Sequence, residues 1–298
     1  MAKSARGYEP LKVFYRTLEP VHIGSGGYRL GRVDNSICRE PGTNLPKIPG
    51  TSLAGAARAY AAMALGKPQA AGQQRGMKPE DRVNCPILFV FGSAADNDTG
   101  QAGKVAFGDA HIVFFPVATM RGPVWVTTPQ LLKRYFEYSL ELATGHRILA
   151  TKGVIDKAGD KLNLGWLLFS ESEVTDELPL TPAVAEDCVK RLAVVHESVF
   201  PQIVNGNLEV RTSVAISPET GAAEPGALFT YEAIPRDCIL VHEVVENCFA
   251  DPPKGVLTDT PLDLALKGLR LIDPLGVGGM GNRGFGRMKM IHPKEKGK

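Results

Sequence analysis

Six glycines fall within residues 276–286, near the end of the chain, and Arg283 and Arg287 stand among or beside them. Glycine allows backbone N–H groups to approach a phosphate closely, and arginine donates charge-assisted hydrogen bonds to it. The segment is therefore suited to hold a phosphate backbone, although a tight turn with a bulge would use the same glycines. It lacks the Gly-Lys-Ser/Thr of a P-loop and the downstream βαβ unit of a dinucleotide-binding fold.

A second group of polar side chains follows the first predicted strand and consists of His22, Asp34, Arg39, Glu40 and Lys47. A loop carboxylate beside basic groups can position a metal-bound water, or a ribose 2′-hydroxyl, for in-line attack on the neighbouring phosphate. Asp34 is the best candidate for that carboxylate. An Asp-Asn pair after glycines is also typical of a turn or cap, and His22 between two apolar neighbours is also typical of a packed histidine.

The elements that must position these residues follow from the hydrophobic pattern. Strands are expected at 11–18, 104–117, 208–216, 227–234 and 239–245, and helices at 51–64, 129–144, 183–198 and 261–271. Thr51 or Ser52 is the expected cap of the first helix, and Gly108 interrupts the second strand. A turn at 217–221 joins its two neighbouring strands into a long hairpin. Because hairpins and helices are interleaved without a regular βαβα alternation, the predicted fold class is α+β.

The composition is that of an ordinary globular protein, with 298 residues, 44% of them hydrophobic and 22% charged. These values exclude a disordered chain or a disulfide scaffold. The first ten residues lack the apolar core of a signal peptide, and no window approaches the roughly 18 apolar residues of a membrane span. We therefore expect a cytoplasmic protein with no membrane partner. The five cysteines form no CxxC pair and no zinc spacing, which predicts reduced thiols without a metal.

The formal net charge of +2 is unevenly distributed along the chain. Residues 1–60 hold nine Lys/Arg and four Asp/Glu, and residues 264–298 hold eight and two, so the middle of the chain is acidic. If the two ends meet in the fold, they form one positive surface, which is typical of a protein that binds a polyanion. The alternative is a pair of solvated tails.

Eight segments in a fixed order resemble a known family. They are LEPVHIGSGG, GRVDNSICRE, LPKIPGTSLAGAAR, FGS, GKVAFGDAHIVFFPV, WVTTPQLLKR, TGAAEPGALFTYEAIP and GVGGMGNRGFGR. From about residue 11 to 290 the chain is similar to the RAMP superfamily and, more narrowly, to the repeated backbone subunit of the type III-B CRISPR (Cmr) effector complex. The segments GKVAFGDAHIVFFPV and EPGALFTYE favour this subunit over its type III-A counterpart.

The resemblance implies an RRM-like, ferredoxin-type palm within a single RAMP domain spanning 1–298. It also implies an inserted finger region at 66–103 and a protruding β-hairpin thumb at 205–236. Copies of such a subunit stack into a helical filament on a CRISPR guide RNA, together with other Cmr subunits. Each thumb pushes between bases, and complementary target RNA is cut at those regular interruptions in a reaction that needs Mg²⁺ or another divalent cation. The implied activity is a metal-dependent RNA endonuclease acting within the complex.

The resemblance also assigns roles to residues of this chain. Asp34 matches the aspartate required for cleavage and is the expected metal ligand, while His22 and Glu232 match positions that could assist. Val214 and Ile216 are the candidate wedges near the tip of the hairpin. The expected RNA-binding residues are Arg39, Lys47, Ser52, Arg58, Gly278, Gly279, Arg283 and Arg287. The family often has a lysine where this chain has Ala54, so a guide-phosphate contact there would be lost or moved to Lys47 or Arg58.

Two other functions stay open from the sequence. One is a non-catalytic backbone subunit, or its type III-A counterpart, that only binds guide and target RNA, in which Asp34 merely shapes its loop. The other is a metal-independent RAMP ribonuclease that processes CRISPR precursor transcripts with a general base such as His22.

Overall fold

A mixed sheet runs through the described part of the chain, with its strands in the order β14-β1-β13-β4-β5-β10-β6-β9 and with β2 and β3 attached at β4 and β13. The computed structural model describes residues 10–26, 33–72, 77–93, 100–142, 147–180, 186–224, 227–247, 256 and 260–293. The sheet strands are β1 (Leu11–Thr17), β2 (Lys47–Ile48), β3 (Val105–Phe107), β4 (Ala110–Thr119), β5 (Gly122–Thr127), β6 (Arg147–Thr151), β9 (Glu171–Thr175), β10 (Leu192–Val195), β13 (Ile239–Glu246) and β14 (Met288–His292).

Two hairpins lie outside this sheet, and helices flank it. The hairpins are β7 (Leu162–Leu164) with β8 (Leu167–Phe169), and β11 (Glu209–Ser213) with β12 (Phe229–Ala233). The helices are α1 (Gly50–Ala64), α2 (Pro79–Val83), α3 (Pro86–Phe91), α4 (Pro129–Phe136), α5 (Glu186–Lys190), α6 (Phe200–Gly206), α7 (Pro261–Arg270) and α8 (Ile272–Leu275), with 3₁₀ turns η1 (Pro68–Ala70) and η2 (Gly281–Arg283). The predicted α+β class is confirmed.

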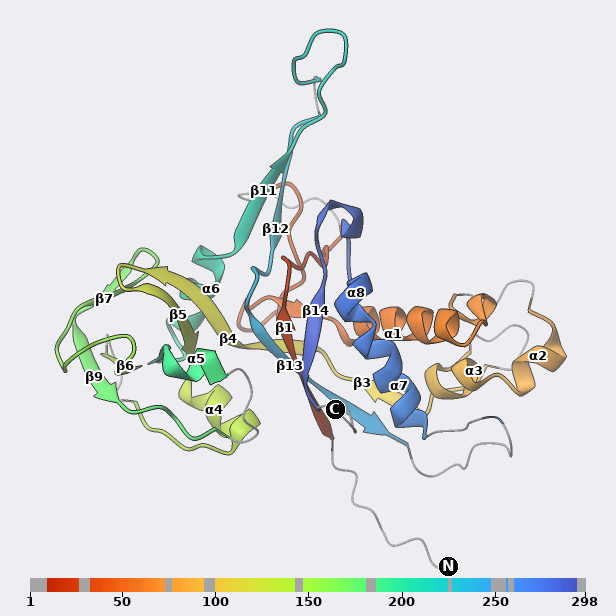
Figure 1. The fold of residues 1–298 in the computed structure, drawn as a ribbon, viewed down its shortest axis with the longest axis horizontal. Helices are drawn as coiled ribbons and strands as arrows, with labels where there is room; N and C mark the ends of the chain where they lie inside the picture. Colours follow the sequence, from red (N-terminus) through yellow and green to blue (C-terminus); the bar gives the residue numbers. More distant parts are fainter. Residues whose placement is uncertain are drawn as a thin grey trace, which may run out of the picture.

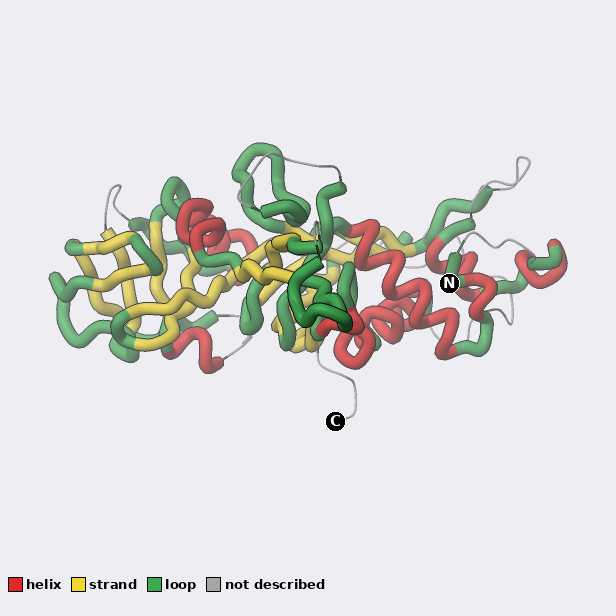
Figure 2. The backbone as a smooth tube through the Cα atoms, turned by 90° about the horizontal axis from the view of Figure 1, so that it is seen from above, coloured by secondary structure: helices red, strands yellow, loops and turns green. Residues whose placement is uncertain are grey.

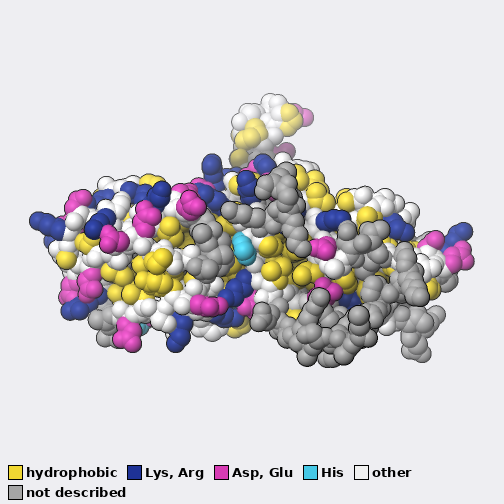
Figure 3. All heavy atoms as spheres, turned by 60° about the horizontal axis from the view of Figure 1, so that its bottom comes forward, with side chains coloured by type: hydrophobic (Ala, Val, Ile, Leu, Met, Phe, Trp, Pro, Cys, Tyr) yellow, Lys and Arg dark blue, Asp and Glu magenta, His cyan; other side chains and the backbone are white. Residues whose placement is uncertain are grey.

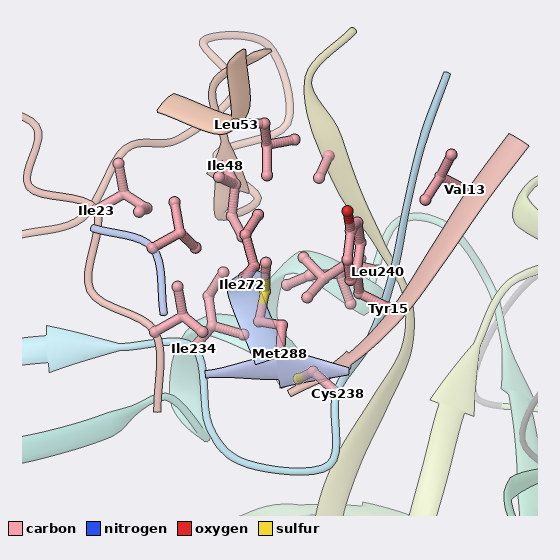
Figure 4. Packing of buried hydrophobic residues seen from close by; sticks show 14 of the residues in the cluster. Val13, Tyr15, Ile23, Ile48, Leu53, Ile234, Cys238, Leu240, Ile272 and Met288 are labelled. Atoms are coloured by element: carbon pink, nitrogen blue, oxygen red, sulfur yellow. The ribbon is translucent and has the colours of Figure 1, made fainter. Parts of the chain in front are cut away.

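The strands β14, β1, β13 and β4 form an antiparallel group at the centre of the molecule (Figure 1). Side chains alternate across a strand, so β1 serves two cores. Val13 and Tyr15 pack toward α1 and α7, and Figure 4 shows Tyr15 beside Leu240 in that core. Phe14 points the other way and lies 5.5 Å from Phe136 of α4, measured between ring centroids. Both faces of the central strands are therefore covered.

The sheet continues beyond its centre because β4 is ten residues long and serves two neighbours in turn. Its first part pairs with β13 and its second part with β5, after which β10, β6 and β9 complete the lobe drawn at the left of Figure 1. From above, most helical segments lie toward the opposite end (Figure 2). The pair β3 and β4, separated at Gly108, confirms the interrupted strand predicted there.

The single helix predicted at 183–198 is wrong. The described part of that stretch is the short helix α5 followed by strand β10, which is inserted between β5 and β6 with all four residues buried. Residues 181–185 lie outside the described ranges. The sequence Leu-Ala-Val-Val suits a strand buried on both faces, and burial of this kind cannot be distinguished from a helical face by periodicity over so few residues.

Two further helix boundaries differ from the predictions. The cap of α1 is neither Thr51 nor Ser52, because the helix begins at Gly50, whose N–H donates to Asp109 Oδ1 at 2.7 Å. Helix α4 stops at Phe136, well before residue 144, since Glu137 adopts the left-handed conformation with φ of 57°. The N-terminal cap of α4 is Thr128, whose side chain accepts from the N–H of Leu131.

The predicted long hairpin is present and projects from the molecule (Figure 1). The strands β11 and β12 pair antiparallel from Glu209↔Ala233 to Ser213↔Phe229, and a further bridge joins Ile216 to Ala223. Residues 225–226 lie outside the described ranges. In the predicted finger region, α3 is buried and packs on α1 and α7 beside the short α2, while residues 73–76 and 94–99 are not described.

Among the described helices, none is long and apolar enough to cross a bilayer. The four described cysteines are free thiols, namely Cys38, Cys85, Cys188 and Cys238, while Cys248 lies outside the described ranges.

A buried histidine in the central sheet makes the stability depend on pH. His242 of β13 is 1% exposed and stacks on the ring of Tyr15, and burial lowers the pKa of His242 to about 4. The unfolded chain then binds a proton more readily than the folded chain between pH 6.5 and 4, so stability is lost as the pH falls through this range.

We expect this histidine to cost about 2 kcal/mol of unfolding free energy between pH 7.5 and pH 5. Urea unfolding at the two pH values measures the loss, and the variant His242→Phe should lose about that much less over the same interval. An equal loss in the variant and the wild type would assign the acid sensitivity to other groups.

Candidate functional site

The two ends of the chain lie side by side, as predicted. Gly279 N–H donates to the carbonyl of His22 at 2.9 Å, and Gly286 N–H donates to the carbonyl of Pro20 at 2.9 Å. Gly278 has a φ of +87°, and a Cβ there would lie 2.4 Å from the carbonyl oxygen of His22. The glycines of 276–286 therefore allow a close approach to the first loop, which accounts for part of the pattern without any phosphate.

Asp34 lies in the first loop and is hydrogen-bonded to the hairpin. Its Oδ2 accepts from the backbone N–H of Thr230 at 2.7 Å and from the Thr230 hydroxyl at 2.9 Å. These two bonds, the backbone one foremost, lower the pKa of Asp34, so the carboxylate is ionised at neutral pH. The side chain is open to solvent. Asp34 is thus an exposed, ionised group with one oxygen already held.

Glu232, the candidate assistant, lies in an ion pair. Its Oε2 lies 2.8 Å from Arg39 Nη2 and also accepts from the N–H of Ile37 at 3.3 Å. The Arg39 and Glu232 side chains are only 12% and 14% exposed. Arg39 also donates to Asn205 Oδ1 and to the carbonyl of Ile37. The geometry gives both residues a structural task, which is to tie the stretch after Asp34 to β12 and α6.

His22 is 6% exposed, and its Nδ1 lies 2.6 Å from the carbonyl oxygen of Glu232. That carbonyl can only accept, so Nδ1 carries the proton. The ring meets Tyr231 edge to face at 6.1 Å between centroids. The packed-histidine interpretation therefore describes His22 well, and its contacts join the first loop to the hairpin.

A small aromatic cluster fixes the root of the hairpin to the glycine segment. Phe285 is 1% exposed and meets Tyr231 at 5.5 Å between ring centroids. The guanidinium of Arg211 lies 4.6 Å from the centroid of the Phe285 ring. The first loop, the hairpin root and the glycine segment thus form one packed unit, and Asp34 is exposed where the loop meets the hairpin root. We call this unit the hairpin-root site.

The expected RNA-binding cations differ in availability. Arg283 is exposed in η2, while Arg287 donates to the carbonyl of Asp273 and lies 3.5 Å from Glu19. Lys47 pairs with Asp109 at 2.7 Å and Glu40 at 2.9 Å, and these carboxylates, Asp109 foremost, raise the pKa of Lys47.

The two expected RNA-binding residues on α1 are Arg58 and Ser52. Arg58 donates to the carbonyl of Ala70, so its guanidinium turns toward the protein, and the resulting burial lowers the pKa of Arg58. Ser52 is half-buried in the first turn of the helix. Figure 3 shows cationic and anionic side chains interspersed on the visible face of the left-hand lobe. At the surface predicted to be positive, ion pairs of Lys47 with Glu40 and Asp109 and of Arg287 with Glu19 partly neutralise the cations.

Among the described residues, no group of three His, Cys, Asp or Glu side chains is arranged to hold a metal ion. Asp34 nevertheless offers one solvent-facing carboxylate. Mg²⁺ is commonly held by one or two carboxylates together with phosphate oxygens and water. A single protein ligand therefore fits a hydrated magnesium ion only when the nucleic acid supplies further ligands.

Sequence reasoning missed several residues of this site, among them Thr230, Asn205, Arg211 and Phe285. Thr230 lies 196 positions from Asp34 in the chain. The signal that could have found it is its place two residues before Glu232 in the FTYEAIP segment, on the strand side that Glu232 shares.

The fold and the site define a class of α+β protein in which a projecting hairpin and a glycine-rich C-terminal segment pack against a first loop that carries an exposed carboxylate. The chain belongs to the RAMP superfamily, which matches residues 14–289. It is 31% identical over 243 residues to the CRISPR system Cmr endoribonuclease Cmr4 of Pyrococcus furiosus, covering 75% of this chain and 77% of that protein. The predicted RAMP membership is confirmed.

Solved structures are similar over nearly the whole chain. A subunit of the type III-B Cmr-beta complex bound to cognate target RNA matches with a TM-score of 0.66 at 18% identity, covering 95% of this chain and 97% of the other. The crystal structure of oligomeric Cmr4 from Pyrococcus furiosus matches with a TM-score of 0.62 at 22% identity, covering 96% and 99%. These matches establish the shared fold.

Proposed function

We propose that this chain is the repeated backbone subunit of a type III-B CRISPR effector and that it cleaves target RNA within that complex. The observation that most supports this function is the exposed, ionised Asp34, which is held at the root of the projecting hairpin. The Cmr4 relative is named an endoribonuclease, and one similar structure is bound to target RNA. Guide RNA, target RNA, further copies of this chain and other Cmr subunits are the proposed partners.

We further propose that β14-β1-β13-β4, with α1 and α7, is the RRM-like palm. The order of elements supports it, since α1 lies between β1 and β4 in sequence and α7 lies between β13 and β14, as in a ferredoxin-type βαββαβ unit. Typical RRMs stack bases on aromatic side chains of the open sheet face. Here Phe14 and Phe114 of that sheet lie under Phe136, so RNA contacts are assigned to the hairpin-root site instead.

The hairpin would serve as the thumb. Val214 and Ile216 are 41% and 56% exposed beyond the last paired residues of β11, and apolar side chains of this kind can separate stacked bases. A base displaced at this point frees its ribose to rotate, which can align the 2′-hydroxyl with the adjacent phosphate. The domain boundaries 66–103 for the finger and 205–236 for the thumb belong to this proposal.

Asp34 would supply the charge at the cut. A bound divalent cation would lower the pKa of the attacking hydroxyl or stabilise the charge that develops on the phosphate. Asp34 would hold such an ion through a carboxylate oxygen, while Arg283 binds a neighbouring phosphate. His22 and Glu232 would act by orienting the first loop against β12, as their hydrogen bonds to backbone groups indicate. Sequence is read by pairing with the guide, so the protein needs no base readout.

A map of cut positions tests the function. The complex, assembled with a guide RNA and given a matching target in Mg²⁺, should produce cuts at a constant interval, one for each stacked copy. Excess EDTA should stop cleavage while target binding, measured by gel shift, continues. A target protected from cutting at every Mg²⁺ concentration would favour the non-catalytic subunit, and cutting that persists in EDTA would contradict the metal requirement.

A further inference from the structure

Thr230 forms hydrogen bonds to Asp34 and Asn35 through its backbone N–H, its hydroxyl and its carbonyl. Its backbone N–H and its hydroxyl both donate to Asp34 Oδ2, at 2.7 and 2.9 Å. The same hydroxyl oxygen accepts from the backbone N–H of Asp34 at 3.1 Å. The Thr230 carbonyl accepts from the N–H of Asn35 at 3.0 Å. A hydroxyl that donates and accepts at once fixes both the loop backbone and the carboxylate.

These bonds extend a strand-like pairing between the first loop and β12. Asn35 forms a parallel bridge with Tyr231, and Glu232 N–H donates to the carbonyl of Asn35 at 3.1 Å. Thr230 is therefore the outermost of these contacts, one residue from Phe229, where the ladder between β11 and β12 ends and the free part of the hairpin begins. The Asp34 carboxylate is therefore held next to the point at which the hairpin leaves the protein.

We propose that Thr230 is the positioning residue of the Asp34 carboxylate, holding Oδ2 so that Oδ1 is the oxygen left to act on the RNA. The inference rests on the proposed function of Asp34 in cleavage. It assigns to the hairpin a second task beside contact with RNA, because the hairpin whose β11 arm leads to Val214 and Ile216 also carries, on β12, the residue that orients the reacting group. Movement of the hairpin root would then move the carboxylate with it.

The Thr230 hydroxyl makes both contacts through a single oxygen atom. Valine has the shape of threonine and a similar preference for strands, but it can neither donate to Oδ2 nor accept from the Asp34 N–H. Thr230→Val keeps the backbone bond to Oδ2 and loses the other two. Serine retains the hydroxyl and lacks only the methyl group, so Thr230→Ser separates hydrogen bonding from packing.

The test compares four complexes assembled with the same guide and target RNA, carrying wild-type protein, Thr230→Val, Thr230→Ser or Thr175→Val. Thr175 ends β9 at the far edge of the sheet and serves as the matched control. We expect Thr230→Val to cleave about 10- to 100-fold more slowly, by analogy with residues that orient metal ligands. Its target affinity and cut positions should be unchanged, and Thr230→Ser and Thr175→Val should cleave near the wild-type rate.

Thr230→Ala is included as a second variant that removes the hydroxyl with no added methyl group, and thermal melting verifies that each chain folds. Wild-type cleavage by Thr230→Val or Thr230→Ala overturns the proposal, as does a Thr230→Ser variant as slow as Thr230→Val. An Asp34→Asn complex run in parallel distinguishes a failure of the function proposed for Asp34 from a failure of the role proposed for Thr230. If Asp34→Asn cleaves normally, the function proposed for Asp34 fails; if it is inactive while Thr230→Val is normal, only the role of Thr230 fails.

Discussion

Asp34→Asn is expected to reduce target cleavage by at least about a hundredfold, the range in which general acid–base or charge-stabilising groups act. The amide oxygen of asparagine can still accept from the Thr230 N–H and hydroxyl, which hold Asp34 Oδ2 at 2.7 and 2.9 Å. The loop therefore keeps its position while the negative charge is removed. Asp34→Ala removes the acceptor as well and should be at least as slow.

The measurement is single-turnover cleavage by the purified complex, with guide loading and target binding determined on the same preparation. Both should match the wild type, because Asp34 is exposed and asparagine can keep the hydrogen bonds of its side chain to Thr230. Asp176→Asn is a suitable control, since Asp176 forms a surface ion pair with Lys152 in the far lobe. Normal cleavage by Asp34→Asn would leave the chain as an RNA-binding backbone subunit whose cutting activity belongs to another component.

The sequence offers Asp34 as a candidate and predicts that the first loop and the glycine segment meet. The structure confirms the meeting, and the role of Asp34 stays a prediction. A loop carboxylate is visible between a strand and a helix, and glycines next to Arg283 mark a segment that can approach other backbone closely. The partners of these residues were not visible. The contact of Asp34 with Thr230 spans 196 positions, and it depends on a register between the first loop and β12 that no local pattern specifies.

Long-range contacts also decide the ion pairs and the fold of the lobe beyond β5, and local patterns do not specify them. Lys47 and Arg39 count as cations in the sequence, but the fold brings Asp109 and Glu232 against them. Strand β10 was predicted as part of a helix because four buried apolar residues fit either element, and only the gap between β5 and β6 decides between them. Local preferences predicted elements well where tertiary contacts agreed with them.

Removing the Glu232 side chain should have a large effect on stability. Glu232→Ala leaves Arg39, 12% exposed, without its carboxylate and frees the N–H of Ile37. The pair is partly buried, and breaking a fully buried ion pair from one side costs about 3–5 kcal/mol. We expect the unfolding free energy of the chain to fall by about 3 kcal/mol in urea titrations. Cleavage should fall with it, because the stretch after Asp34 keeps its backbone pairing with β12 but loses its side-chain attachment there.

Two companion variants distinguish this positioning role from direct chemistry. Glu232→Gln keeps an oxygen that accepts from Ile37 and Arg39, so it should lose only about 1–2 kcal/mol and retain cleavage. Replacing the whole pair, as Arg39→Met with Glu232→Leu, removes both charges and should recover part of the stability lost by Glu232→Ala. If Glu232→Gln is as stable as the wild type but inactive, the carboxylate acts on the RNA itself. If the double variant without either charge cleaves RNA, the Arg39–Glu232 pair serves only to hold the loop in place, and Asp34 remains the proposed reacting carboxylate.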